Sequence, residues 1–208
     1  TVIGVDPGEK ISGLVVMRNS QIIEAVNIDN DELYNKVMKY YHKNNTMVLI
    51  EDIAPYLGRL TPNVIETSKL IGEIKFRLKT DDIPHQLIVR SEVKRYIFNT
   101  FPEICLPKIS KRIEKKGQVL KNGEFKQPHF FYVNDQLVEL SMRQKFNIQK
   151  PFNKNKYGLS KHSYQALALI MAFKDKNQTY FSEIAAANQL NKLKADFENI
   201  IWNANELF

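Results

Sequence analysis

The chain has 208 residues, of which 43% are hydrophobic and 11% aromatic, and its formal net charge is +7. This length and composition predict a single folded domain, residues 1–208, with one sizeable core. No stretch approaches the roughly eighteen apolar residues of a membrane span, and the N-terminus does not have the pattern of a signal peptide. We therefore expect a soluble, cytoplasmic protein without a membrane partner, and the single cysteine, Cys105, agrees with a reducing compartment.

The first eight residues predict a buried strand that ends in an acid. Three β-branched residues lead to Asp6, and Pro7-Gly8 then turns the chain away. An aspartate that merely opens a turn would explain this pattern if it occurred alone. The pattern returns at residues 46–52, where an apolar run ends in Glu51 and Asp52. Two buried strands that end in carboxylates are costly unless a cation neutralises them, so the sequence predicts a metal site.

The residues between these acids predict the rest of a sheet with one helix. Strands are expected at 11–17 and 21–26, joined by a short hairpin turn at 18–20. Asn30 or Asp31 begins a helix that leads to the strand ending at Glu51.

Beyond Glu51 the chain predicts two more helices with a strand between them. After a loop at 53–60, Thr61-Pro62 starts a helix that ends before Pro84, a short strand follows at 86–89, and a helix begins between Ser91 and Val93. The element order describes an α/β fold with a mixed sheet flanked by helices.

A basic insertion interrupts this regular order at about residues 103–158. From Cys105 to Lys161 there are thirteen Lys or Arg residues and four acids, a net charge of +9, which leaves −2 for the remainder. A localised polyanion contact and a merely solvated face explain this charge equally well. Within the insertion, Asn122-Gly123 predicts a hairpin, and a helix is expected over Asp135–Phe146.

The C-terminal part predicts a buried helix followed by an amphipathic one. Ser160 is expected to cap a helix over Lys161–Phe173 that is apolar almost all round and has His162 and Gln165 on one face of its first turn. That face either serves a site or faces solvent. A last helix, about 180–207, has apolar residues at a period of 3.5, which fits packing on its own domain or a dimer interface.

Taken together, these motifs resemble the RuvC family of Holliday junction resolvases, of the type found in phages and prophages, within the ribonuclease H-like superfamily. The resemblance spans residues 1–173 in the family's order. It is carried by Ile3-Gly-Val-Asp-Pro-Gly8, Leu49-Ile-Glu51, the helix containing Gly72, Val93-Lys94, and His162-Ser-Tyr-Gln-Ala-Leu-Ala168. It implies a ribonuclease H-like five-stranded mixed sheet flanked by helices, here with the basic insertion and an extra C-terminal helix.

The resemblance also implies a nuclease site with two divalent ions, Mg²⁺ or Mn²⁺. Asp6, Glu51 and His162 match metal-binding positions of the family, and Gln165 stands where the family has its final aspartate. An amide offers a metal one neutral oxygen but no charge, so metal binding should weaken. The chain is then an inactivated variant, a diverged enzyme with a compensating ligand such as Asp52, or a DNA-binding protein that has lost catalysis.

The predicted DNA contacts come from the same resemblance and from the basic insertion. Lys94 matches a lysine near the scissile phosphate, and Tyr56 and Arg59 lie where the family inserts side chains at the junction centre. The remaining predicted DNA-binding residues are Arg95, Lys111, Arg112, Lys115 and Lys116.

The sequence-based hypothesis is a structure-selective endonuclease that resolves four-way or other branched DNA, acting as a homodimer because two symmetric nicks need two sites. The alternative is a catalytically impaired junction-binding protein of the same fold. A third hypothesis, an actin-like phosphotransferase, lacks the glycine-rich phosphate loops that it needs.

Overall fold

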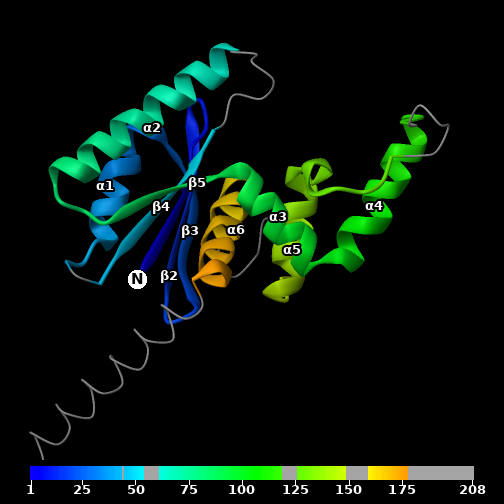
Figure 1. The fold of residues 1–208 in the computed structure, drawn as a ribbon. Helices are drawn as coiled ribbons and strands as arrows, with labels where there is room; N and C mark the ends of the chain where they lie inside the picture. The colour runs from blue at the N-terminus through cyan, green and yellow to red at the C-terminus, as the bar shows by residue number, and fades with distance from the viewer. Residues whose placement is uncertain (44, 54–60, 119–125, 149–158, 178–208) are drawn as a thin grey trace, which may run out of the picture. The chain divides into compact units, whose positions relative to one another are not determined.

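The computed structural model describes residues 1–43, 45–53, 61–118, 126–148 and 159–177 (Figure 1). The chain divides into two compact units, Thr1–Ala172 and Phe173–Phe208. Three predicted features lie outside the described residues: the loop with Tyr56 and Arg59, the Asn122-Gly123 hairpin and the last helix at 180–207. Among the described helices, none has the length and apolar character needed to cross a membrane.

The core of the first unit is a mixed five-stranded sheet, as predicted. Its strand order is β3-β2-β1-β4-β5, in which β1 pairs antiparallel with β2 and parallel with β4. The strands are β1 (Val2–Asp6), β2 (Ile11–Arg18), β3 (Gln21–Asp29), β4 (Met47–Asp52) and β5 (His85–Val89). Asn19 and Ser20 have φ of 48° and 63°, which suits the right-handed twist of the β2–β3 hairpin.

Two helices cover one face of this sheet, α1 (Asn30–Tyr40) and α2 (Pro62–Thr80) (Figure 1). Alternate strand residues, including Val5 and Ile50, form one buried cluster with Leu33 and Val37 of α1 and with apolar residues of α2. Because successive side chains of a strand point to opposite faces, Asp6 and Glu51 point to the other face of the sheet.

Helix α6 (Lys161–Lys176) lies against this other face, and its residues 163–170 are all buried, as the apolar sequence predicted. Two glycines permit the close approach of helix to sheet. A Cβ atom on Gly4 would lie 2.5 Å from the carbonyl oxygen of Ala166, and one on Gly13 would lie 2.3 Å from the carbonyl carbon of His162. The strands therefore fix the position of the first turns of α6.

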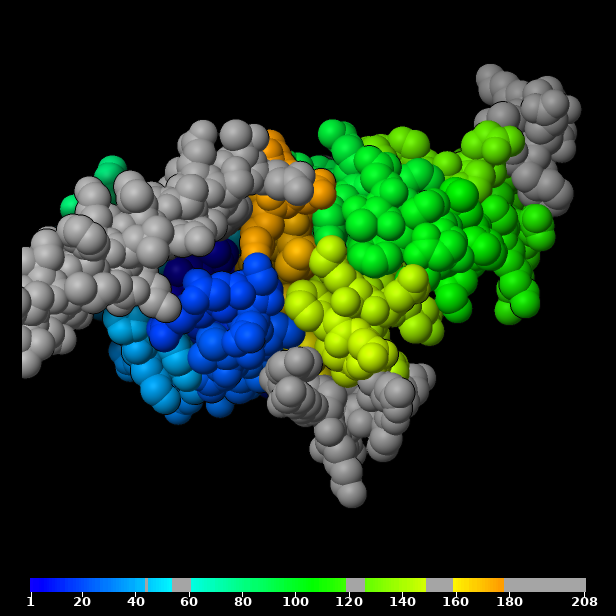
Figure 2. Space-filling view, turned by 90° about the horizontal axis from the view of Figure 1, so that it is seen from below, coloured from blue at the N-terminus to red at the C-terminus, as the bar shows by residue number. Residues whose placement is uncertain are grey.

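The segment after β5 is largely helical, with α3 (Arg90–Thr100), α4 (Pro102–Lys115), a 3₁₀ turn η2 (Phe130–Tyr132) and α5 (Asp135–Lys145). In Figure 2 the segments of residues 90–118 and 126–148 lie to one side of α6, and the N-terminal strands lie to its other side. Helix α5 confirms the prediction for residues 135–146. Helix α4 was not predicted, although Cys105, Ile109 and Ile113 recur every four residues and are all buried.

Candidate active site

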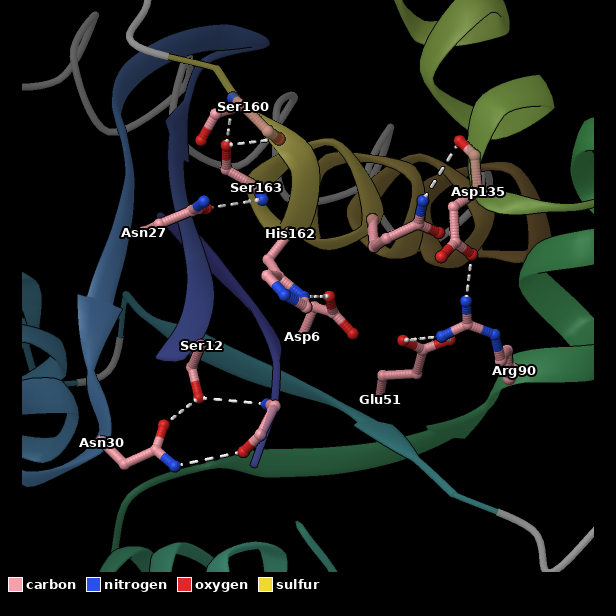
Figure 3. Close-up of polar contacts among 12 residues, drawn as sticks. Asp6, Ser12, Asn27, Asn30, Glu51, Arg90, Asp135, Ser160, His162 and Ser163 are labelled. Carbon is pink, nitrogen blue, oxygen red and sulfur yellow. Dashed lines mark hydrogen bonds and ion pairs between the residues drawn. The ribbon is translucent and has the colours of Figure 1, made fainter. Parts of the chain in front are cut away.

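Two carboxylates meet at one edge of the sheet. Asp6 ends β1 and Glu51 lies near the end of β4, and the parallel register of these neighbouring strands pairs Val5 with Ile50. The two acids therefore lie side by side on the face that α6 covers (Figure 3). Asp6 is 4% exposed and Glu51 is 3% exposed.

Burial sets the protonation of this pair. Loss of hydration raises the pKa of Asp6 and raises that of Glu51 well above the ordinary range of a glutamate. A hydrogen bond that protonated Glu51 donates to Asp6 raises the pKa of Glu51 further. Two neighbouring carboxylates with little access to water are stable when they share a proton or face a cation.

His162, in the first turn of α6, joins the pair. Its Nδ1 lies 2.9 Å from Oδ2 of Asp6. Burial, helped by the charge of Lys161, lowers the pKa of His162 and so favours the neutral ring. A neutral imidazole that meets a carboxylate through Nδ1 donates its proton there, which leaves the Nε2 lone pair for another partner.

Backbone and side-chain hydrogen bonds hold α6 in this position. The Ser163 amide donates to Oδ1 of Asn27 on β3 at 3.1 Å, and the Ser160 amide donates to the Ser163 hydroxyl at 2.7 Å (Figure 3). The start of α6 is therefore tied to β3 as well as packed on Gly13 of β2.

A second set of hydrogen bonds shapes the turn that follows Asp6. The Gly8 amide donates to the Ser12 hydroxyl at 3.4 Å, this hydroxyl donates to Oδ1 of Asn30 at 2.7 Å, and Nδ2 of Asn30 donates to the Gly8 carbonyl at 3.1 Å (Figure 3). The strand that carries Asp6 therefore ends in a fixed turn.

Arg90 is also part of this site, although no sequence motif indicated it. It is the first residue of α3, directly after β5, and its Nη1 lies 3.3 Å from Oε1 and 3.2 Å from Oε2 of Glu51. Its Nη2 donates to the carboxylate of Asp135 at the start of α5 (Figure 3). Burial disfavours the charge of Arg90, but Glu51 and Asp135 outweigh it and raise its pKa.

Gln165 is 5% exposed and lies near Asp135, whose backbone carbonyl accepts a hydrogen bond from Nε2 of Gln165 at 3.4 Å. Asp52, the acid we considered as a compensating ligand, follows Glu51 in β4 and so points to the opposite face of the sheet. The contact of Gln165 is therefore with the backbone of Asp135.

The predicted DNA-binding residues fall into two groups. Lys94 is half-buried one turn after Arg90, and burial, together with the charge of Arg90, lowers its pKa. Arg95 is exposed and lies 4.9 Å from the centre of the Phe130 ring. On α4, Arg112 donates to the Tyr132 carbonyl, so it also holds η2 in place. The other predicted residues of α4 and its end are exposed: Lys111, Lys115 and Lys116.

The donor types at this site suit a hard divalent cation, because two carboxylates and a neutral imidazole supply oxygen and nitrogen ligands. In the described part of the chain, however, no group of three His, Cys, Asp or Glu side chains is arranged to hold a metal ion. Both oxygens of Glu51 contact the Arg90 guanidinium instead. A metal ion at Glu51 would therefore share this carboxylate with Arg90 or displace it.

Comparison with solved structures identifies the fold. Over 84% of this chain and 94% of the other, the chain matches Thermus thermophilus RuvC in complex with a Holliday junction substrate, with a TM-score of 0.53 and 14% identity. A second structure of Thermus thermophilus RuvC matches with a TM-score of 0.51 and 15% identity, over 86% of this chain and 96% of that one. The chain has the RuvC fold. This confirms the predicted ribonuclease H-like α/β architecture.

At the sequence level no family model matches the chain. No curated protein matches it either. The RuvC-like fold is therefore recognised from the arrangement of its elements, and the roles of individual residues rest on the geometry of the site.

Proposed function

We propose that the chain is a structure-selective endodeoxyribonuclease that acts on branched DNA such as a four-way junction. The observation that carries this proposal is the convergence of Asp6, Glu51 and His162 from β1, β4 and α6 at one edge of a RuvC-like sheet. The RuvC structure that matches the chain was determined with a Holliday junction substrate, which supports branched DNA as the partner.

In this proposal Asp6, Glu51 and His162 hold Mg²⁺ or Mn²⁺, and Gln165 supplies at most a neutral oxygen. Bound divalent ions would make a water nucleophilic and stabilise the leaving oxygen of the phosphodiester. With Nδ1 directed at Asp6, His162 would present Nε2 as a ligand. Lys94, one turn after Arg90 on α3, would hold a phosphate oxygen near the carboxylates.

A second candidate function is junction binding without cleavage. Two observations favour it. Gln165 is neutral where the RuvC family has an aspartate, and Arg90 supplies a positive charge next to Glu51. A site that is neutralised by its own arginine needs a metal less than a site of bare carboxylates does. The exposed lysines of α4 would serve DNA binding in either case.

We further propose that the active form is a homodimer. Resolution of a four-way junction requires two cuts on opposite strands, and a two-fold dimer is the simplest assembly that provides two sites. Light scattering of the full chain tests this part of the proposal, and a monomer at the concentrations used for cleavage would contradict it.

The decisive experiment compares a labelled four-way junction with a linear duplex of the same sequence, while Mg²⁺ or Mn²⁺ is titrated. We expect metal-dependent cleavage of the junction and little cleavage of the duplex. Tight junction binding with no cleavage at any metal concentration would reject the nuclease in favour of the second candidate.

A further inference from the structure

The Arg90 guanidinium contacts the same two oxygens of Glu51 that a metal ion would use as ligands. Nη1 is within 3.3 Å of both Glu51 oxygens, and Glu51 is only 3% exposed. A coordinated Mg²⁺ would need to sit about 2.0–2.1 Å from one of these oxygens. Two positive charges would then lie within a few ångströms of each other in a poorly hydrated site, where their repulsion is large.

A second acid holds Arg90 from the other side. Asp135 accepts a hydrogen bond from Nη2, so the guanidinium bridges β4 and α5 (Figure 3). The side chains of Arg90 and Asp135 are 39% and 51% exposed, in contrast to the 4% of Glu51. Arg90 can therefore turn toward solvent and keep its contact with Asp135, whereas Glu51 cannot follow it.

We propose that Arg90 is a built-in counter-ion that competes with divalent metal for Glu51, and that Asp135 holds it at the site. This inference rests on the proposed function only in taking Asp6 and Glu51 as metal ligands. Metal binds the fraction of molecules in which Arg90 has left Glu51, so its apparent affinity is reduced by that fraction.

The inference predicts that removing the guanidinium tightens metal binding. In Arg90→Gln the guanidinium that contacts both oxygens of Glu51 is gone. We expect the Kd for Mn²⁺ to fall by about tenfold, which corresponds to an Arg90 that is displaced about a tenth of the time in the parent. In Asp135→Asn, Arg90 is held less firmly, and the Kd should fall by a smaller factor.

The experiment is calorimetric titration of Mn²⁺ into the DNA-free full-length protein. Arg77→Gln is the matched control, because it removes an equal charge from an exposed ion pair with Glu73 on α2. Its Kd should equal that of the parent. Glu51→Gln is made in the parent and in Arg90→Gln, and the gain in affinity should vanish when Glu51 is absent.

Thermal unfolding with and without Mn²⁺ gives a second measurement. A ligand that binds the folded state stabilises it more when its Kd is lower. Mn²⁺ should therefore raise the unfolding temperature of Arg90→Gln by more than it raises that of the parent.

Three results would overturn the inference. A Kd for Arg90→Gln equal to or weaker than that of the parent would show that Arg90 does not compete with metal. A gain that persists without Glu51 would show that the effect does not pass through this carboxylate. Weaker binding in Asp135→Asn would show that Asp135 is a ligand and not the residue that holds Arg90.

These outcomes are independent of the proposed nuclease activity, because no DNA is present. A parent protein that fails to cleave while Arg90→Gln binds Mn²⁺ tightly would reject the function and support the inference. A parent that cleaves while Arg90→Gln gains no affinity would do the reverse.

Discussion

The contact between Gly13 and the start of α6 can be tested by adding a single methyl group. In Gly13→Ala the new Cβ atom would lie 2.3 Å from the carbonyl carbon of His162 and 2.6 Å from the Ser163 amide nitrogen. Ordinary van der Waals contact of a Cβ atom begins at 3.4 Å, so strand and helix must separate by 1.1 Å. The neighbouring atoms belong to backbone, so no side-chain rotation can relieve the clash.

This separation acts directly on the site. If α6 moves by 1.1 Å away from the sheet, the 2.9 Å contact between Nδ1 of His162 and Asp6 lengthens to about 4.0 Å, which is beyond hydrogen-bond range. Overpacking of this kind costs about 1–3 kcal/mol of the free energy of unfolding. For a chain of this size about 2–4 °C is lost per kcal/mol, so we expect the unfolding temperature to fall by roughly 2–12 °C.

Circular dichroism on heating and single-turnover cleavage of a four-way junction measure the two effects. Gly72→Ala is the matched control: Gly72 is exposed on α2, and nothing lies within 4 Å of its new Cβ atom. Alanine in a helix should there raise the free energy of unfolding by about 0.5–1 kcal/mol. A Gly13→Ala protein that unfolds at or above the parental temperature would refute the close packing of α6 on β2.

Three further predictions follow from burial and charge. Burial raises the pKa of Glu51. Above the ordinary glutamate pKa of about 4.3, the metal-free native state therefore binds more protons than the unfolded chain does. The free energy of unfolding should then decline as the pH rises above about 4.3. Denaturant titrations in EDTA should show a smaller decline for Glu51→Gln, and an unchanged decline would contradict the shift. Burial raises the pKa of Cys105 to about 11, and this residue is 0% exposed. A disulfide reagent at pH 8 should therefore react with it only after denaturation. Rapid reaction of the native protein would argue against the packing of α4. Replacing the exposed Lys111, Lys115 and Lys116 with Gln should weaken binding to all DNA. The slope of log affinity against log salt should flatten by about 0.9 for each phosphate that the protein no longer neutralises. An unaltered slope would place the DNA elsewhere.

The strands and the two acids could be predicted from the sequence because their signals are local. Asp6 and Glu51 each end a short apolar run, and the order of elements is enough to place both runs in one sheet. The buried helix α6 could also be predicted from the sequence, since its own apolar residues lie on nearly all of its faces.

Helix α4 was missed because prolines obscured it. Pro102 occupies the first turn of the helix, where proline is permitted. Pro107 lies inside the helix, and a proline at an interior position normally predicts the end of a helix. The buried positions Cys105, Ile109 and Ile113 were the signal that could have shown it.

The role of Arg90 could not have been predicted from neighbouring residues. It depends on the pairing of β4 with β5, which sets Asp52 opposite Val89 and so brings the next residue close to Glu51. It also depends on Asp135, which is 45 residues further along the chain and arrives through the packing of α5. The sequence indicates Asp135 only as the start of a helix. Both residues belong to the site through tertiary structure.

The carboxylate of Asp6 provides the most direct test of the proposed nuclease. Single-turnover cleavage of a labelled four-way junction in Mn²⁺ should be abolished in Asp6→Asn, while junction binding is retained or strengthened because a negative charge near the phosphates is removed. Asp52→Asn, which removes a carboxylate from the opposite face of the sheet, should cleave at the parental rate. Cleavage by Asp6→Asn at the parental rate would contradict the assignment of this site.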